Sequence, residues 1–512
     1  MKTRREALVI FGGTAAVIGV SAGGWARAAA TRPASDGLKR AAPGDIGVDP
    51  DAVLAFLEEA ERLGLELNSF MLTRHGAVAA EGWWWPYRSD VYHMLHSSTK
   101  SFVGAGIGIA IGEGLLRLDD PVLKFFPDRI ANPSANLQAM TVENLLTQTS
   151  GHAVGISGSQ WRPIKTSWVT EFLKVPVDYA PGTRFAYSSA TSFMLSAIIT
   201  QITGAPLRDY LEPRLFEPMG IRNYHWDVGP ENINPGGNGL STTTADFSKL
   251  GLMLLDGGRW NGRQIVPADW AAAIGRSTHG NPYGYQWWVA PGDAGYFAGG
   301  KFGQVSIVVP ALDAVLTMTA GVADNAATRE KMQALAFGHL PKMCSEVAAK
   351  PESDEKLRAR SENLRILPPL AASTSPLTKK IGDRMYRCAD NADQVKAVGL
   401  RFEKGCALFS MHDHRGTHVV KNGTEEWLES ETTITGGYLH HEYDPPKMRV
   451  VAGGRWLTEN CYEMVWQFIE TGFRDTATLT FEGDTIRYDR KTNVNSGDLA
   501  RPTITGTLSS LR

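Results

Sequence analysis

A serine and a lysine lie three positions apart in the segment Ser97-Ser98-Thr99-Lys100. On a helix this spacing puts the hydroxyl and the amine on one face, about one turn apart. A lysine in that place can take the serine proton only if burial or a neighbouring cation lowers its pKa. The pair therefore predicts nucleophilic catalysis by Ser97, with Lys100 helping to deprotonate it.

The spacing alone does not identify a site, because Ser353 and Lys356 repeat it. That second pair lies in a strongly charged stretch with no apolar helix behind it. Residues 97–116, by contrast, are apolar and rich in Gly, Ala and Ile, which predicts a helix buried on most sides. We therefore expect Ser97 to be the functional serine, held rigidly at the start of that helix.

A tyrosine follows ninety residues after Ser97, in the segment Tyr187-Ser188-Ser189. A phenol beside a lysine ammonium can be held partly as phenolate, so Tyr187 is a candidate general base that passes the proton to the leaving group. The alternative is a tyrosine that only packs in the core. The preceding Pro181-Gly182 turn and the order of the motifs favour catalysis.

Three segments resemble those of class C β-lactamases and related serine hydrolases. Residues 95–102 resemble the nucleophile segment of that family. Residues 141–151 are similar to its leucine-rich helix and Thr-Ser-Gly loop, with Gln148 in place of a frequent histidine. Gly300-Lys301-Phe302-Gly303-Gln304 resembles the Lys-Thr-Gly strand, with Phe302 in place of the usual small hydroxyl residue. The resemblance covers roughly residues 40–345.

The resemblance implies roles for five further groups. Lys301 would supply positive potential near Tyr187 and Lys100, and Gly303 would let substrate lie close to the strand. The backbone amides of Ser97 and Gln304 would form the oxyanion hole. Ser189 replaces the asparagine that contacts the acylamide in penicillin-recognising members. This replacement favours the family's carboxylesterases and small-amide hydrolases.

The resemblance leaves alternatives open for the function. We expect a small-molecule ester, amide or peptide substrate, cleaved through an acyl-enzyme without a metal or organic cofactor. A β-lactamase or D-Ala-D-Ala peptidase is the first alternative. A non-catalytic, penicillin-binding-like sensor is the second, although the set of Ser97, Lys100 and Tyr187 argues against it.

The elements around these motifs indicate an α+β fold. A helix over 53–64 and a hairpin over 69–80 precede the nucleophile, and strands return at 304–309 and 314–319 after a mostly helical middle. We assign residues 36–345 to a β-lactamase/transpeptidase-like domain, with an antiparallel sheet flanked by helices and an all-helical subdomain.

The chain is long enough for more than one domain, since it has 512 residues. Residues 346–375 are rich in charge, Pro and Ser, which predicts a linker. Residues 376–512 contain short β-patterned segments between Gly, Asn and Asp turns, which predict a small all-β domain of unknown role.

The N-terminus has the pattern of a twin-arginine signal peptide, assigned to residues 1–28. Arg4-Arg5 precedes a glycine-rich apolar stretch and Ala26-Arg27-Ala28, a signal-peptidase site. We expect export to the periplasm or outside the cell, and no membrane span in the mature protein.

Charge and metal-ligand patterns exclude several other classes. The net charge of −2 gives no indication of a nucleic-acid partner, because such binding needs an excess of positive charge. Alternating His412 and His414 would suit a metal site, but exposed histidines at a strand end are the plainer reading, and we assign no metal. Export permits a disulfide in the last third of the chain, whose pairing stays open among Cys344, Cys388, Cys406 and Cys461.

Overall fold

A mixed sheet forms the centre of the N-terminal part of the computed structural model, which describes residues 36–508 apart from 291, 293, 347 and 349. The strand order is β1-β3-β2-β12-β11-β10-β9, and only β1 pairs in parallel, with β3. The strands are β1 Lys39–Arg40, β2 Leu67–Arg74, β3 Ala77–Trp83, β9 Trp288–Val289, β10 Tyr296–Gly300, β11 Gln304–Val309 and β12 Ala314–Ala320. The predicted signal segment, residues 1–28, lies outside the described residues.

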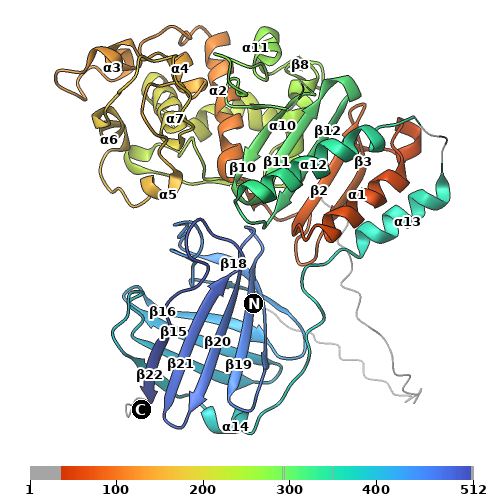
Figure 1. Cartoon of the computed structure of the whole chain (residues 1–512), viewed down its shortest axis with the longest axis vertical. Helices are drawn as coiled ribbons and strands as arrows, with labels where there is room; N and C mark the ends of the chain where they lie inside the picture. The colour runs from red at the N-terminus through yellow and green to blue at the C-terminus, as the bar shows by residue number, and fades with distance from the viewer. Residues whose placement is uncertain (1–35, 291, 293, 347, 349, 509–512) are drawn as a thin grey trace, which may run out of the picture. The chain divides into compact units, whose positions relative to one another are not determined.

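Alternation along the strands gives the sheet two apolar faces. Register pairs Ile307 with Leu316 and Leu316 with Leu72, so these side chains share the face that packs against α1 (Pro50–Arg62) and α12 (Ala326–Met343). Val308 and Val315 lie on the opposite face, against α10 (Thr244–Leu255). Figure 1 shows α12 lying across β10, β11 and β12.

A helical region inserted between β3 and β9 carries most of the remaining core. Besides α10, its helices are α2 Thr99–Gly112, α3 Ala135–Ala139, α4 Val142–Leu146, α5 Gly158–Trp161, α6 Trp168–Lys174, α7 Ser189–Thr203, α8 Leu207–Leu211, α9 Glu217–Met219 and α11 Ala268–Ala273. Helices α2 and α7 are buried along most of their length, as their unbroken apolar sequences require. Short strands also occur here: β4 His93–Met94, β5 Tyr224–Trp226, β6 Leu240–Thr242, β7 Arg259–Trp260 and β8 Arg263–Gln264.

The segment predicted as a linker contains a helix. Residues Pro351–Glu362 form α13, which buries Leu357 against the N-terminal domain. After it, the chain pairs with Trp85, whose backbone N–H donates to Leu364 O over 2.9 Å. The charged surface of α13 explains the composition that indicated a linker. The first half of this segment is therefore part of the N-terminal domain's outer layer.

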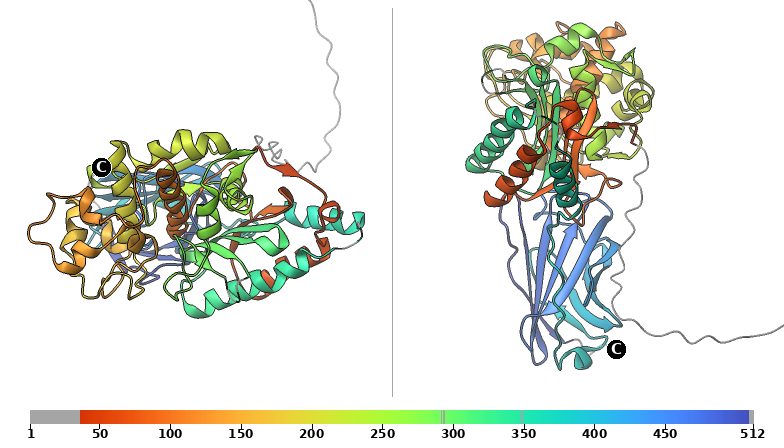
Figure 2. Two further views of the ribbon diagram at one scale, coloured as in Figure 1. Left: turned by 90° about the horizontal axis from the view of Figure 1, so that it is seen from above. Right: turned by 90° about the vertical axis from the view of Figure 1, so that its right-hand side faces the viewer.

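The C-terminal domain is a closed β-barrel, and the all-β prediction is confirmed. Its ten strands follow the order β16-β15-β14-β13-β22-β21-β20-β19-β18-β17, and Gly423 of β16 pairs with Gly453 of β18 to close it. Figure 2 shows the strands running side by side. They are β13 Met385–Cys388, β14 Ala397–Glu403, β15 Cys406–Asp413, β16 Gly416–Gly423, β17 Leu428–Thr432, β18 Met448–Trp456, β19 Cys461–Phe468, β20 Arg474–Glu482, β21 Thr485–Thr492 and β22 Ile504–Leu508, after the short helix α14 Thr378–Ile381.

One end of the barrel forms hydrogen bonds with the segment that precedes the nucleophile. The barrel and the N-terminal domain belong to one compact unit of the protein. The Met94 N–H, three residues before Ser97, donates to Glu470 O over 2.8 Å. Tyr87 Oη donates to Thr471 O over 2.6 Å. Because both acceptors lie in the turn between β19 and β20, this turn is fixed against the catalytic domain.

The four cysteines of the chain and the barrel residue His412 do not form the disulfide or the metal site that their positions could suggest. All four cysteines are free thiols, so the disulfide that export would permit is not formed. His412 Nδ1 lies 3.1 Å from Thr417 Oγ1. Among the described residues, no three His, Cys, Asp or Glu side chains are grouped as a metal site would require.

No single helix of the described residues has the length and apolarity to cross a membrane. A bent pair, Ser189–Thr203 with Leu207–Met219, reaches the threshold by length and composition when taken together. Most residues of the first member are buried in the core of the N-terminal domain.

Candidate active site

Ser97 lies in a 3-10 turn, His96–Ser98, that leads directly into α2. Twelve of the fourteen residues of α2 are buried, so the helix is a rigid base for this turn. One turn after Ser97, the Nζ atom of Lys100 lies 3.2 Å from Ser97 Oγ. The predicted serine and lysine are thus brought within hydrogen-bond distance at the start of a buried helix.

Lys100 is buried without a counter-ion. Its Nζ donates to Gly237 O over 2.8 Å and to Ser189 Oγ over 3.3 Å. No carboxylate of the described chain pairs with it. Only 1% of Lys100 is exposed, and this burial lowers its pKa to about 7. The amine is therefore substantially neutral near physiological pH and is able to accept a proton from Ser97.

Tyr187 lies over the same two residues. Lys100 Nζ is 4.8 Å from the centroid of its ring. Burial raises the pKa of Tyr187 to about 12, against the opposing effect of hydrogen bonds with the side chains of Ser97 and Trp288. The phenol is therefore neutral at pH 7. The partial phenolate character that we expected is not favoured, because desolvation of the hydroxyl outweighs its two hydrogen bonds.

Gln148 holds the Tyr187 segment from both sides. Its carbonyl accepts from Ala186 N–H over 2.9 Å, and its Oε1 accepts from Ser188 N–H over 2.7 Å. Gln148 itself is fully buried and has a left-handed backbone, with φ of 61°. The residue that departs from the family's histidine is thus a positioning residue for Tyr187.

Ser189 begins α7, directly after the capping residue Ser188. Its hydroxyl accepts from Lys100, and its N–H donates to Ile156 O over 2.8 Å. The predicted substrate-binding hydroxyl is therefore already part of the lysine's hydrogen-bond shell.

Lys301 lines the same cavity as Ser97 and Tyr187, and it is not free there. Its ammonium forms an ion pair with Asp324, which also binds Arg329 over 2.8 Å. The Lys301 charge contributes to the lowered pKa of His96, whereas that of Lys100 is lowered by burial. The positive potential that Lys301 would supply to Tyr187 and Lys100 stays a prediction, and the paired Asp324 carboxylate offsets part of that charge.

Gly303 and Gln304 follow Lys301 at the turn between β10 and β11. Gly303 has φ of 99°, and a Cβ atom there would lie 2.8 Å from the Ala320 side chain, which accounts for glycine at this position. Ser98 Oγ donates to Gln304 O over 3.1 Å, which ties the start of β11 to the nucleophile turn. The action of the Ser97 and Gln304 amides as an oxyanion hole stays a prediction.

One cavity of about 650 Å³ is lined by six of the predicted site residues: Ser97, Tyr187, Ser189, Lys301, Gly303 and Gln304. Register places Phe297 opposite Ile307 and Gly299 opposite Val305, so their side of the sheet faces α12. An aromatic path runs along this wall from the Tyr187 ring. The ring centroid of Trp288 is 5.1 Å from Tyr187, and that of Phe297 is 6.4 Å from Trp288. Apolar side chains complete the wall: Ile156, Val305, Ile307, Met318, Val322, Met332, Ala336 and Phe337.

Three contributors were missed by the sequence analysis. The Gly237 carbonyl binds Lys100 but, as a backbone group, has no residue-type signal. Trp288 contacts Tyr187 by ring and hydrogen bond, a pairing that no spacing in the sequence indicates. His441, from the barrel, lines the same cavity as Ser97.

Comparison with known proteins agrees with this arrangement. The family described as Beta-lactamase matches residues 53–340. The 6-aminohexanoate-dimer hydrolase of Paenarthrobacter ureafaciens is 25% identical over 308 residues, covering 54% of this chain and 78% of that protein. Esterase EstB of Burkholderia gladioli is 30% identical over 156 residues, covering 27% of this chain and 39% of its own length.

A solved structure shows the same fold. It is a Bacillus anthracis protein provisionally assigned as a 6-aminohexanoate-dimer hydrolase, with a TM-score of 0.51 and 17% identity, covering 60% of this chain and 87% of that chain. The family match extends over more than half of the chain and includes Ser97, Lys100 and Tyr187. The chain therefore belongs to the beta-lactamase family of serine hydrolases.

Proposed function

We propose that this protein is an exported hydrolase that cleaves small esters or amides through an acyl-enzyme on Ser97. The observation that carries the proposal is the buried, unpaired Lys100 amine within hydrogen-bond distance of the Ser97 hydroxyl. A buried lysine with a pKa of about 7 is matched to a base that works near neutral pH.

The proposed acylation begins when Ser97 Oγ attacks the substrate carbonyl and gives its proton to neutral Lys100. As the tetrahedral intermediate collapses, the bond to the leaving group breaks and the leaving oxygen or nitrogen takes a proton from Tyr187. Lys100 returns its proton to Tyr187, so both groups regain their starting state. Water then attacks the acyl-serine by the same route and releases the acid.

The cavity favours substrates that carry apolar groups. Its aromatic wall begins at the Tyr187 ring and ends at the apolar side chains of α12. Ser189, at the position of the family's acylamide-binding asparagine, accepts from Lys100 and offers one hydroxyl where that asparagine offers a full amide for a β-lactam side chain. The activities in the names of two relatives, a dimer hydrolase and an esterase, agree with this substrate class.

A substrate panel tests the proposal on the purified mature protein. It contains p-nitrophenyl butyrate, linear amide dimers, nitrocefin and a D-Ala-D-Ala peptide, each measured beside Ser97→Ala. We expect Ser97-dependent turnover of the ester or the amide above that of nitrocefin and the peptide. Preferential turnover of nitrocefin or the peptide would contradict the substrate assignment. Covalent labelling by a fluorophosphonate with no turnover of any substrate would instead support a sensor.

Export is the second part of the proposal, and it rests on the Arg4-Arg5 motif and the Ala26-Arg27-Ala28 site. Fractionation of cells that express the full chain tests it, with an Arg4→Lys, Arg5→Lys double variant as control. We expect a shortened, exported protein that the double variant retains inside the cell. Equal export of both would contradict a twin-arginine route.

A further inference from the structure

The barrel contributes one side chain to the substrate cavity. Among the described residues that line the cavity with Ser97 and Tyr187, His441 alone comes from the C-terminal domain. It lies in the loop between β17 and β18, at the end of the barrel that is bonded to the nucleophile segment. Its ring centroid is 6.1 Å from that of His96, the residue before Ser97.

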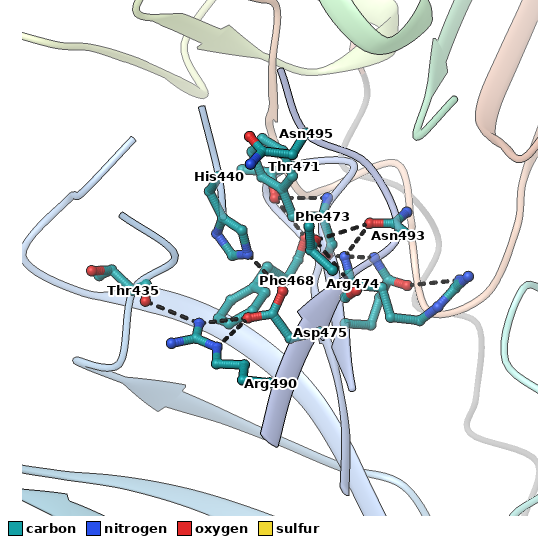
Figure 3. Close-up of polar contacts among 12 residues, drawn as sticks. Thr435, His440, Phe468, Thr471, Phe473, Arg474, Asp475, Arg490, Asn493 and Asn495 are labelled. Atoms are coloured by element: carbon teal, nitrogen blue, oxygen red, sulfur yellow. Dashed lines mark hydrogen bonds and ion pairs between the residues drawn. The ribbon is translucent and has the colours of Figure 1, made fainter. Parts of the chain in front are cut away.

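His440 anchors this loop inside the barrel. Its Nε2 lies 2.8 Å from Asp475 Oδ1, and Arg490 Nε donates to the other oxygen of Asp475 over 2.7 Å (Figure 3). The His440 ring also stacks on Phe473, with centroids 4.3 Å apart. A buried ion pair thus fixes the residue next to His441.

His441 is itself held at the backbone and the ring. Its N–H donates to Asn495 Oδ1 over 3.1 Å, and its Nδ1 lies 2.6 Å from Ser496 Oγ. Its backbone is left-handed, with φ of 56°. On the side of the catalytic domain, Arg162 donates to His441 O over 3.3 Å. The ring is therefore positioned before substrate arrives.

The chemistry of the ring follows from these contacts. Burial, with the charges of Lys301 and Arg162, lowers the pKa of His441 to about 3, so the imidazole is neutral. Ser496 occupies Nδ1, and no described residue hydrogen bonds Nε2. The Nε2 atom of the neighbouring His96 is buried and has no hydrogen-bond partner among the described residues. The Nε2 atom of His441 thus provides unused hydrogen-bonding capacity at a part of the cavity that also includes Phe302.

We infer that His441 is a specificity-determining residue of the hydrolase, supplied by the barrel, and that its Nε2 hydrogen bonds an uncharged amide group of the substrate beyond the scissile bond. An amide offers both a donor and an acceptor, so it can pair with either tautomer of the neutral ring. The inference rests on the proposed function, because it concerns the same cavity. It assigns the C-terminal domain a direct part in choosing the substrate.

Matched pairs of esters test the inference on the full mature chain. Each pair has equal chain length and differs by an amide in place of methylenes. The acyl-chain pairs are p-nitrophenyl 6-acetamidohexanoate with nonanoate, and 4-acetamidobutanoate with heptanoate. The alcohol-side pair is N-acetylethanolamine acetate with pentyl acetate. The wild-type protein should prefer the amide member of at least one pair in kcat/KM.

The His441→Phe variant should reduce that preference about 3- to 10-fold, the effect of one hydrogen bond. His441→Asn, which tolerates the left-handed backbone, should do the same if the phenylalanine variant does not fold. The control is His412→Phe, on a barrel strand outside the cavity, which should keep the wild-type preference.

Three outcomes separate the inference from the proposed function. A wild-type preference for the methylene member of every pair would overturn the inference. So would an amide preference that both His441 variants retain. If the wild-type protein neither turns over any ester nor reacts with a fluorophosphonate, the proposed function itself fails.

Discussion

A basic side chain is buried beside the catalytic serine and another at the end of the barrel, and the two differ in whether a carboxylate pairs with them. Lys100 has only a carbonyl and hydroxyl groups as partners, and its pKa falls to about 7. Arg490 has Asp475 as counter-ion, the carboxylate is 0% exposed, and the pKa of Asp475 falls to about 2. A cation without a counter-ion is ready to lose its proton, whereas a paired one is fixed as a structural charge.

The strongest test of this contrast replaces two buried lysines of the catalytic domain. Lys100→Met should reduce kcat/KM for p-nitrophenyl butyrate about 10³-fold, because it removes the proton acceptor. Lys249→Met is the matched control, since Lys249 is equally buried but pairs with Asp246 over 2.6 Å.

Lys249→Met should cost about 3–5 kcal/mol of unfolding free energy, because it leaves a buried carboxylate unpaired. Its folded fraction should keep kcat/KM within about threefold of wild type, since the pair is outside the reaction path. Denaturant unfolding and active-site titration separate the two effects. An equal loss of kcat/KM in folded Lys100→Met and folded Lys249→Met would contradict a special role for the lysine without a counter-ion.

In the barrel, the same contrast predicts that removing the counter-ion of Arg490 lowers the free energy of unfolding and leaves the catalytic residues unchanged. Asp475→Asn leaves the buried Arg490 charge without its counter-ion and should lower the unfolding free energy by about 3 kcal/mol. Asp489→Asn, on the same domain but partly exposed, should change it by less than about 0.5 kcal/mol. Urea unfolding measures both. Equal stability of the two variants would contradict a structural role for the buried pair.

The pH dependence of kcat/KM should follow the ionisation of Lys100, the lysine without a counter-ion. Lys100 acts as a base only when neutral, and its pKa is about 7. Activity should therefore fall about tenfold for each pH unit below 7 and level off above it. Tyr187, with a pKa of about 12, should cause no further change in kcat/KM between pH 6 and 9. A profile that is flat from pH 5 to 8 would contradict Lys100 as the base.

The smallest effect concerns the residue that positions Tyr187. Gln148→Leu leaves the buried Ser188 N–H without its acceptor, which should displace the phenol and reduce kcat about threefold to tenfold. Gln138→Leu, on an exposed surface, is the control and should leave kcat unchanged. An unchanged kcat in Gln148→Leu would show that Tyr187 is held by its other contacts.

The sequence predicted well those features that a local pattern determines. The hairpin of β2 and β3 and the strands β11 and β12 lie where the alternation of apolar residues places them. Strand β10 was missed, because its Tyr296–Gly300 segment is short and glycine-rich. That same strand passes beside the nucleophile, where a Cβ atom on Gly300 would lie 2.2 Å from Leu95 O.

The site could be predicted only in part, because several of its contacts join distant parts of the chain. The Ser97 and Lys100 spacing is local and was recognised. The partner of Lys301 is Asp324 on a separate loop, and no spacing rule connects them. His441 reaches the cavity only because the barrel is bonded to residues before Ser97, and a strand pattern gives no sign of such a contact.

Fluorophosphonate labelling followed by peptide mapping tests the central claim most directly. The account predicts one adduct on the mature protein, at Ser97, absent from Ser97→Ala and formed much more slowly in Lys100→Met. It predicts none at Ser353, whose lysine, Lys356, is exposed and bound to Glu352. An adduct on another serine, or undiminished labelling of Ser97→Ala, would contradict it.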